Sequence, residues 1–61
     1  MSEQSSNERW EEAIANARYF LDEYRKIPTG MFGAIFIATA ITRYENGERT
    51  QELLEELEGI H

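Results

Sequence analysis

The chain has 61 residues, so it forms at most one small domain, and a domain of this size buries only about 60% of its unfolded surface. It contains no cysteine, which excludes disulfides and thiolate metal sites, and its one histidine is His61. Twelve acidic and six basic residues give a formal net charge of −6, which disfavours direct binding to nucleic acid or to an anionic membrane. Association with another chain is the remaining way for such a domain to gain stability.

The N-terminal part of the chain predicts a tail followed by a helix. Residues 1–6 are polar and are expected to form a flexible tail, so the single helical domain is expected to span residues 7–61. Ser5 and Glu8 have the spacing of a capping box. From there to Lys26, apolar side chains recur at alternating steps of four and three residues, as on one face of a helix. This apolar stripe consists of Trp10, Ile14, Ala17, Leu21 and Tyr24.

A break follows at Ile27-Pro28. Proline cannot continue the first helix, and it biases the residue before it away from helical geometry. Thr29 is a suitable N-cap for a second helix of roughly residues 30–45. Asn46-Gly47 is a suitable stop for that helix, because glycine readily adopts the left-handed conformation.

A strand is the alternative for residues 33–42. Ile35, Ile37, Thr39 and Ile41 alternate with smaller residues, and an Asn-Gly pair is typical of hairpin turns. The segment 48–52 would make a poor return strand, since it is polar and has little β propensity. The helix is therefore the favoured prediction.

Residues 50–60 predict a third helix, with Leu53, Leu54, Leu57 and Ile60 spaced along one face. The fold class is therefore all-α, a three-helix domain built on an α-hairpin. The second helix is apolar nearly all round, so two neighbours in the same chain cannot cover it. We expect the domain to self-associate through Met31, Phe32, Ile35, Phe36 and Ala38.

The sequence offers little for catalysis. It has no cysteine, no internal histidine and no nucleophile–base pair of the kind that covalent catalysis needs. Adjacent carboxylates such as Glu55 and Glu56 point in different directions on a helix, so they do not share a proton or a metal. We expect a protein that is not an enzyme, with no catalytic residue, metal or cofactor.

An acidic stretch near the C-terminus is the first candidate binding surface. Between Glu45 and Glu58 there are six carboxylates, against Arg49. On a helix, Glu52 and Glu56 are separated by about 6 Å along the axis, which is comparable to the spacing of successive phosphates. Such a row could occupy the basic groove of a nucleic-acid-handling protein, although acidic helix faces are also common on ordinary surfaces. The residues expected to bind a partner are Glu45, Glu48, Glu52, Glu55 and Glu56, with Trp10, Tyr19 and Phe32 as apolar anchors.

The turn at Pro28-Thr29-Gly30 is the second candidate. Free backbone N–H groups at a helix N-terminus bind anions, and Thr29 and Gly30 suit such a site. Basic and aromatic side chains from elsewhere in the chain or from a second copy could complete it. A nucleotide-like ligand would then contact Arg25, Lys26, Thr29, Gly30, Arg43 and Tyr44.

The segment Ile27-Pro28-Thr29-Gly30-x-Phe32, followed by an Ala- and Ile-rich helix, resembles small uncharacterised helical proteins encoded by phages and prophages. The resemblance covers about residues 20–45, and the sequence departs from that pattern after Tyr44. It implies a viral context, in which short acidic proteins often act as stoichiometric inhibitors of host defence.

The function expected from these observations is inhibition of a host defence protein in the host cytoplasm, and a protein that handles nucleic acid is the favoured target. The alternatives are an oligomer that sequesters a nucleotide-like ligand and a purely structural, self-assembling factor. No nucleic acid or membrane is expected to bind directly.

Overall fold

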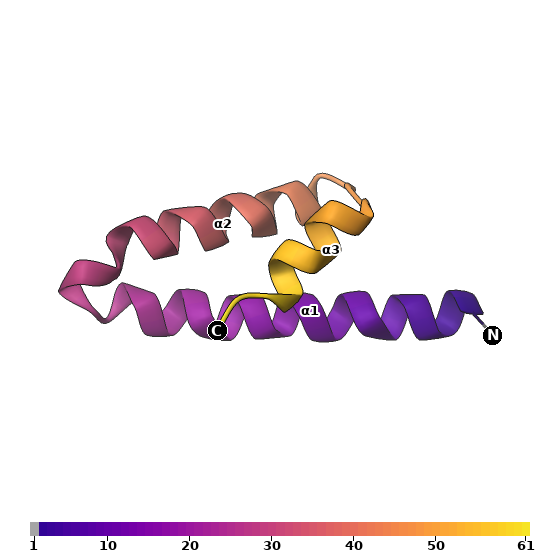
Figure 1. Cartoon of the computed structure of the whole chain (residues 1–61), viewed down its shortest axis with the longest axis horizontal. Helices are drawn as coiled ribbons and strands as arrows, with labels where there is room; N and C mark the ends of the chain where they lie inside the picture. Colours follow the sequence, from indigo (N-terminus) through magenta and orange to yellow (C-terminus); the bar gives the residue numbers. More distant parts are fainter. Residues whose placement is uncertain (1) are drawn as a thin grey trace.

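The computed structural model describes the backbone of residues 2–61 and the side chains of residues 7–61. Within that part of the chain it has three α-helices, α1 (Ser2–Arg25), α2 (Met31–Glu45) and α3 (Gln51–Glu58), a 3-10 turn η1 (Pro28–Gly30) and no strand. The predicted all-α, three-helix fold is thereby confirmed, and the strand alternative for residues 33–42 is wrong. Helices α1 and α2 form an antiparallel hairpin, and the short α3 crosses them near the open end of the hairpin (Figure 1). The molecule measures 43 × 16 × 15 Å along its principal axes.

Helix α1 begins earlier than the sequence indicates. Its first residue is Ser2, so Ser5 lies inside the helix and the predicted start near Ser5 and Glu8 is wrong. The tail predicted for residues 1–6 falls partly outside the described residues: Met1 is not described, and only the backbone of residues 2–6 is. None of the described helices combines the length and apolarity needed to cross a membrane.

The corner between α1 and α2 follows from the backbone chemistry of proline. Ile27 is extended, with φ −101° and ψ 121°, as expected for a residue that precedes proline. The turn η1 closes with a hydrogen bond from the Gly30 N–H to the Ile27 carbonyl (2.9 Å). The N-cap of α2 is Gly30, which has no side chain, whereas Thr29 lies within η1. The prediction that Thr29 caps α2 is therefore wrong, because the 3-10 turn moves the helix start past it.

The end of α2 is confirmed at Asn46-Gly47. The Gly47 N–H donates to the Tyr44 carbonyl (3.0 Å) and the Glu48 N–H to the Arg43 carbonyl (3.1 Å), which is the Schellman pattern. Gly47 has φ +97°, a conformation that disfavours any residue with a Cβ.

Thr50 is the N-cap of helix α3, and its hydroxyl accepts a hydrogen bond from the Leu53 N–H (3.1 Å). This is the N-cap geometry that threonine favours, and it starts the third helix where the sequence predicts.

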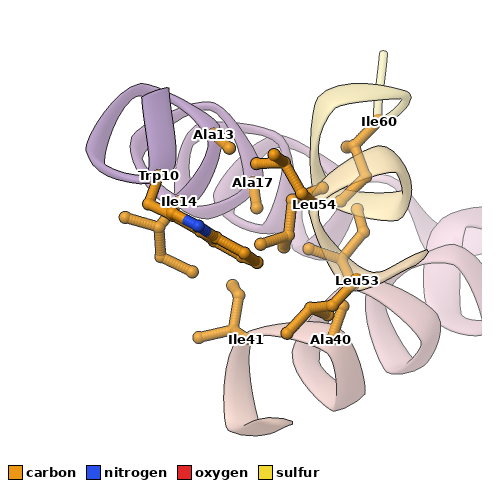
Figure 2. Packing of buried hydrophobic residues seen from close by; sticks show 11 residues of the cluster. Trp10, Ala13, Ile14, Ala17, Ala40, Ile41, Leu53, Leu54 and Ile60 are labelled. Carbon is orange, nitrogen blue, oxygen red and sulfur yellow. The ribbon is translucent and has the colours of Figure 1, made fainter. Parts of the chain in front are cut away.

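One apolar cluster holds the three helices together, at the open end of the hairpin. Helix α1 contributes the N-terminal half of its apolar stripe, α2 its inner face and α3 its leucines (Figure 2). Leu53 and Leu57 are fully buried, so α3 is the element inserted most deeply into this core. The buried members of the cluster are Trp10, Ala13, Ile14, Ala17, Ile37, Ala40, Ile41, Leu53, Leu54, Leu57 and Ile60.

Candidate protein interface

The outer face of α2 is exposed and apolar. We use this name for Met31, Phe32, Ile35, Phe36, Thr39 and Thr42, the α2 residues that point away from the core. The four large side chains of this face are 64%, 84%, 56% and 57% exposed, in chain order. Contiguous exposed apolar surface on this scale marks an interaction site or an aggregation hazard. The outer face of α2 is therefore the first candidate interface.

The two threonines of this face present little unsatisfied polarity. The Thr39 hydroxyl donates to the Ile35 carbonyl and the Thr42 hydroxyl to the Ala38 carbonyl, both at 2.9 Å. Each hydroxyl is thus turned back onto its own helix, which leaves the side-chain methyl group available for packing. The outer face is consequently apolar along most of α2.

One flank of this face opens into a shallow groove of about 400 Å³ between α1 and α2. The partly buried Ala38 lies in this groove together with Ala34, and Arg25 lines it at the hairpin tip. The five residues predicted to form an oligomer interface thus occupy one continuous part of the surface. Their role in an interface remains a prediction.

The acidic row, which consists of the carboxylates between residues 45 and 58, surrounds the side chain of Arg43. Arg43 donates through Nε to Glu48 Oε1 and through Nη1 to Glu56 Oε2, both at 3.0 Å, and its Nη2 lies 3.9 Å from Glu52 Oε1. These contacts tie the end of α2 to the following loop and to α3. Three of the five predicted partner-binding carboxylates therefore face one guanidinium, which offsets part of their charge.

Glu48 is the centre of this arrangement. Hydrogen bonding from Arg43, with a smaller contribution from the Thr50 hydroxyl, lowers the pKa of the Glu48 carboxyl below its ordinary value. The same ion pair raises the pKa of Arg43. Thr50 donates to Glu48 while it accepts from the Leu53 N–H, so the loop, the helix cap and the ion pair form one connected network.

Of the carboxylates predicted to bind a partner, three are exposed, and Glu52 is among them although it lies near Arg43. Glu52 has a side chain that is 80% exposed, and Glu55 is exposed and accepts a hydrogen bond from Gln51 (3.1 Å). Glu45 forms a longer, exposed pair with Arg18 (3.4 Å). The negative charge available to a partner is therefore concentrated on Glu45, Glu52 and Glu55.

Trp10 is not a surface anchor, and the prediction that it contacts a partner is wrong for this fold. Its side chain is only 8% exposed, because it packs in the core and against the Tyr44 ring at a centroid distance of 5.8 Å. Arg49 lies over both rings, 3.7 Å from the Tyr44 centroid and 5.3 Å from that of Trp10. Phe32 and Tyr19 are exposed as predicted, but Tyr19 lies on α1, opposite the core, and apart from the outer face of α2.

The residues of the predicted anion site are not brought together within one chain. Arg25, Lys26, Thr29 and Gly30 lie at the hairpin tip, whereas Arg43 and Tyr44 lie about 20 Å away along α2. Carboxylates already contact the side chain of Arg43, and the ring of Tyr44 packs against that of Trp10. Within one chain the six residues therefore do not form a site.

Local packing also accounts for the residues at the tip. The Lys26 ammonium lies 3.2 Å from both Asp22 and Glu23. A Cβ on Gly30 would lie 2.6 Å from the Tyr24 carbonyl oxygen, so the close approach of two backbones explains this glycine without a ligand.

Asn16 is a structurally important residue that the sequence reasoning missed. Its side-chain amide donates to the Ile60 carbonyl at 2.9 Å and to the Leu57 carbonyl at 3.4 Å, which satisfies the end of α3. The available signal was its place between Ala13 and Phe20, at helical spacing from both. The bidentate pair of Arg9 with Glu58, at 2.6 and 2.9 Å, was missed as well, since no pattern in the sequence pairs residues so far apart.

Among the described residues, no three His, Cys, Asp or Glu side chains converge in a geometry that could hold a metal ion. Searches of protein-family models, of curated proteins and of solved structures each gave no significant match.

Proposed function

We propose that this chain acts by binding another protein chain, with the outer face of α2 as the contact surface. The observation that carries the proposal is the exposure of Met31, Phe32, Ile35 and Phe36 on a chain whose other large apolar residues mostly pack in the core. Interfaces are anchored by such side chains, aromatic ones above all, when they become fully desolvated.

The acidic side chains give this binding a preferred partner charge. Glu45, Glu52 and Glu55 lie toward the α3 end of the molecule, and the chain has a net charge of −6. A field of this sign favours a basic partner and accelerates the encounter with it. In the viral context implied by the phage-like turn, we propose a stoichiometric inhibitor of a basic host protein in the cytoplasm.

Site-specific photocrosslinking tests the contact surface. The variant Phe36→p-benzoylphenylalanine is expected to form a covalent adduct with a protein chain in cells, because position 36 lies on the proposed contact surface. The matched control is Tyr19→p-benzoylphenylalanine, since Tyr19 is an aromatic residue of similar exposure (61%) on the other side of the molecule. Adducts at both positions in equal yield, or at neither, would contradict the proposed contact surface.

Charge reversal tests the role of the acidic residues. Replacing Glu52 and Glu55 by lysine is expected to weaken the salt-sensitive binding of a basic partner that is captured from cells with the wild-type chain. The same change at Glu11 and Glu12, which are exposed on α1, is the control for net charge. Equal weakening by both pairs would show that only net charge matters, and no weakening by either would remove the acidic residues from the proposal.

A further inference from the structure

We infer that the occupant of the outer face of α2 is a second copy of this chain, packed antiparallel through α2. This inference rests on the proposed function, because both use the same face. It names a second copy as the chain that binds there, and the basic host protein would then meet the exposed Glu52 and Glu55, which lie outside that face. The inference is carried by four properties of the outer face of α2: its residue spacing, its gradient of side-chain size, its lack of charge and its area.

The spacing is that of a helix–helix seam. Phe32, Ile35, Thr39 and Thr42 follow one another at steps of three, four and three residues. This is the a/d repeat with which two helices pack side by side at a crossing angle of about 20°. None of these four positions is used by the core, which takes Ile37, Ala40 and Ile41 from the opposite side of α2.

The size gradient makes the seam complementary to itself in one direction. Its large members, Phe32 and Ile35, lie in the first half of α2, and its small members, Thr39 and Thr42, lie in the second half. An antiparallel pair, symmetric about residue 37, sets Phe32 against Thr42 and Ile35 against Thr39. Large side chains then meet small ones throughout, which fills space evenly. A parallel pair would place the two phenylalanines in contact and leave the threonines facing each other across a gap.

Charge favours the same arrangement. The segment 31–42 contains no ionisable residue, so two chains of net charge −6 can approach there. In the antiparallel pair the two acidic α3 helices lie at opposite ends, whereas a parallel pair would place them side by side.

A favourable contact between the copies is also expected at each hairpin tip. Arg25 lines the groove beside Ala34 and Ala38, and it forms none of the ion pairs found among the described residues. On the helix, Glu45 lies on the same flank as those two alanines. Antiparallel pairing therefore places Glu45 of one copy beside the hairpin tip of the other copy, where Arg25 lies.

The area reaches the lower limit for a specific interface. The exposed fractions of the four large side chains correspond to about 500 Å² per copy, taking about 200 Å² as the full surface of such a side chain. Complete burial of these side chains in two copies would remove about 1,000 Å² from solvent, with Ile27 and the threonines in addition, which is the lower limit of a biological interface.

Oligomer mass is the first measurement. Native mass spectrometry and sedimentation equilibrium of the purified chain, whose mass is 7.1 kDa, are expected to show a dimer. Ile35→Asp is expected to raise the dissociation constant by about 30-fold or more, because it places an uncompensated charge at the centre of the seam. Its circular dichroism should stay unchanged, since Ile35 is exposed in the monomer. A folded wild-type monomer at about 100 µM, well above typical dimer dissociation constants, would overturn the inference.

Disulfide trapping tests the direction of packing, because the chain has no cysteine of its own. An equimolar mixture of Ile35→Cys and Thr39→Cys is expected to form mainly the mixed 35–39 disulfide, since only antiparallel packing places these two positions face to face. Tyr19→Cys is the control and should remain reduced under the same conditions. Predominant 35–35 and 39–39 disulfides would instead indicate a parallel pair and overturn the inference.

A charge swap tests the contact at the tips. Arg25→Glu and Glu45→Arg are each expected to weaken the dimer about threefold, and the double variant is expected to recover most of the loss. Weakening without recovery would overturn the proposed pairing of these residues.

The failure of this inference can be told apart from the failure of the proposed function. A monomeric chain that still forms adducts at position 36 with other proteins in cells would overturn self-pairing and leave the proposed function standing. A monomeric chain without any adduct at position 36 would overturn both.

Discussion

Asn16 shows how one side chain can end a helix that lacks a glycine of positive φ. Helix α3 stops at Glu58 and Gly59 has φ −82°, so the last carbonyls need donors from elsewhere. The Asn16 amide supplies them across the domain, to Leu57 and Ile60. This contact gives a polar residue a structural role beside the apolar stripe of α1.

Removing the amide is expected to destabilise the chain by about 1 kcal/mol, the usual net contribution of such hydrogen bonds. For Asn16→Ala this corresponds to a decrease in melting temperature of about 4–8 °C. Asn16→Asp keeps the size of the side chain but cannot donate when ionised, so it should cost more at pH 7 and recover as the introduced carboxylate is protonated. Thermal unfolding at pH 7 and pH 4, followed by the fluorescence of Trp10, measures both effects. Equal melting temperatures for the wild type and Asn16→Ala would contradict this role.

At the level of elements, α1 and α2 approach each other closely at Gly33. A Cβ built on Gly33 would overlap the ring of Tyr24, which packs directly on the α2 backbone. Tyr24 also donates from its hydroxyl to the His61 carbonyl (2.8 Å), so its ring position is fixed from two sides. The glycine is therefore required by the packing of the hairpin and not by the conformation of α2.

Gly33→Ala is expected to destabilise the chain by about 1–3 kcal/mol, the usual cost of overpacking. In a helix without this contact the same substitution would stabilise by about 1 kcal/mol, because alanine is the better helix former. The sign should therefore reverse in a Tyr24→Ala background, where the ring is absent. Urea unfolding of the two single variants and the double variant measures this coupling. The contact would be refuted if Gly33→Ala had the same effect in both backgrounds.

At the level of the whole molecule, ion pairs add to the apolar packing that holds α3 against the hairpin. Arg43 joins α2 to the loop and to α3, and Arg9 joins α1 to the end of α3. The pKa of the Glu48 carboxyl is lowered in the folded chain. Its ion pair with Arg43 therefore stabilises the fold at pH values above the ordinary carboxyl pKa of about 4.5. That stabilisation is lost as the pH falls through the lowered pKa, and the pKa of Glu58, lowered by Arg9, adds a contribution of the same sign.

The difference in melting temperature between the wild type and Glu48→Gln is therefore expected to be largest above pH 4.5 and to vanish at lower pH. Glu11→Gln removes the same formal charge from an exposed position of α1 and serves as the control. Comparing variants at each pH cancels the change in net repulsion that all of them share. A difference that stays constant from pH 7 to pH 3 would show that the ion pair with Arg43 does not stabilise the fold.

The parts of this fold that depend on periodicity were predictable. The stripe from Trp10 to Tyr24, the leucines of α3 and the stop at Gly47 each follow from local spacing or local conformation, and the structure confirms them. The start of α1 at Ser2 was not predictable, since residues 2–6 carry no apolar pattern to mark a helix. The N-cap of α2 was not predictable either, and Thr29 is not that cap. The 3-10 turn that contains Thr29 depends on the contact between Tyr24 and Gly30, which composition does not reveal.

The candidate surfaces were predictable only in part. The excess of apolar residues in α2 correctly indicated a face that the chain does not cover, and Phe32 and Ile35 lie on it. The partners of Arg43 and the burial of Trp10 depend on the position of α3, which connects residues far apart in the sequence. A row of charges in a sequence therefore overstates the charge that remains available once the chain has folded.

The division of α2 into two faces has an evolutionary consequence. Ile37, Ala40 and Ile41 are constrained by the core, whereas Met31, Phe32, Ile35 and Phe36 lie outside it. Substitutions in the second group can accumulate without loss of the fold, so binding preference can diverge between lineages while the scaffold persists. In a set of diverging descendants, positions 35 and 39 would be expected to change together in size, and positions 37 and 41 to remain aliphatic.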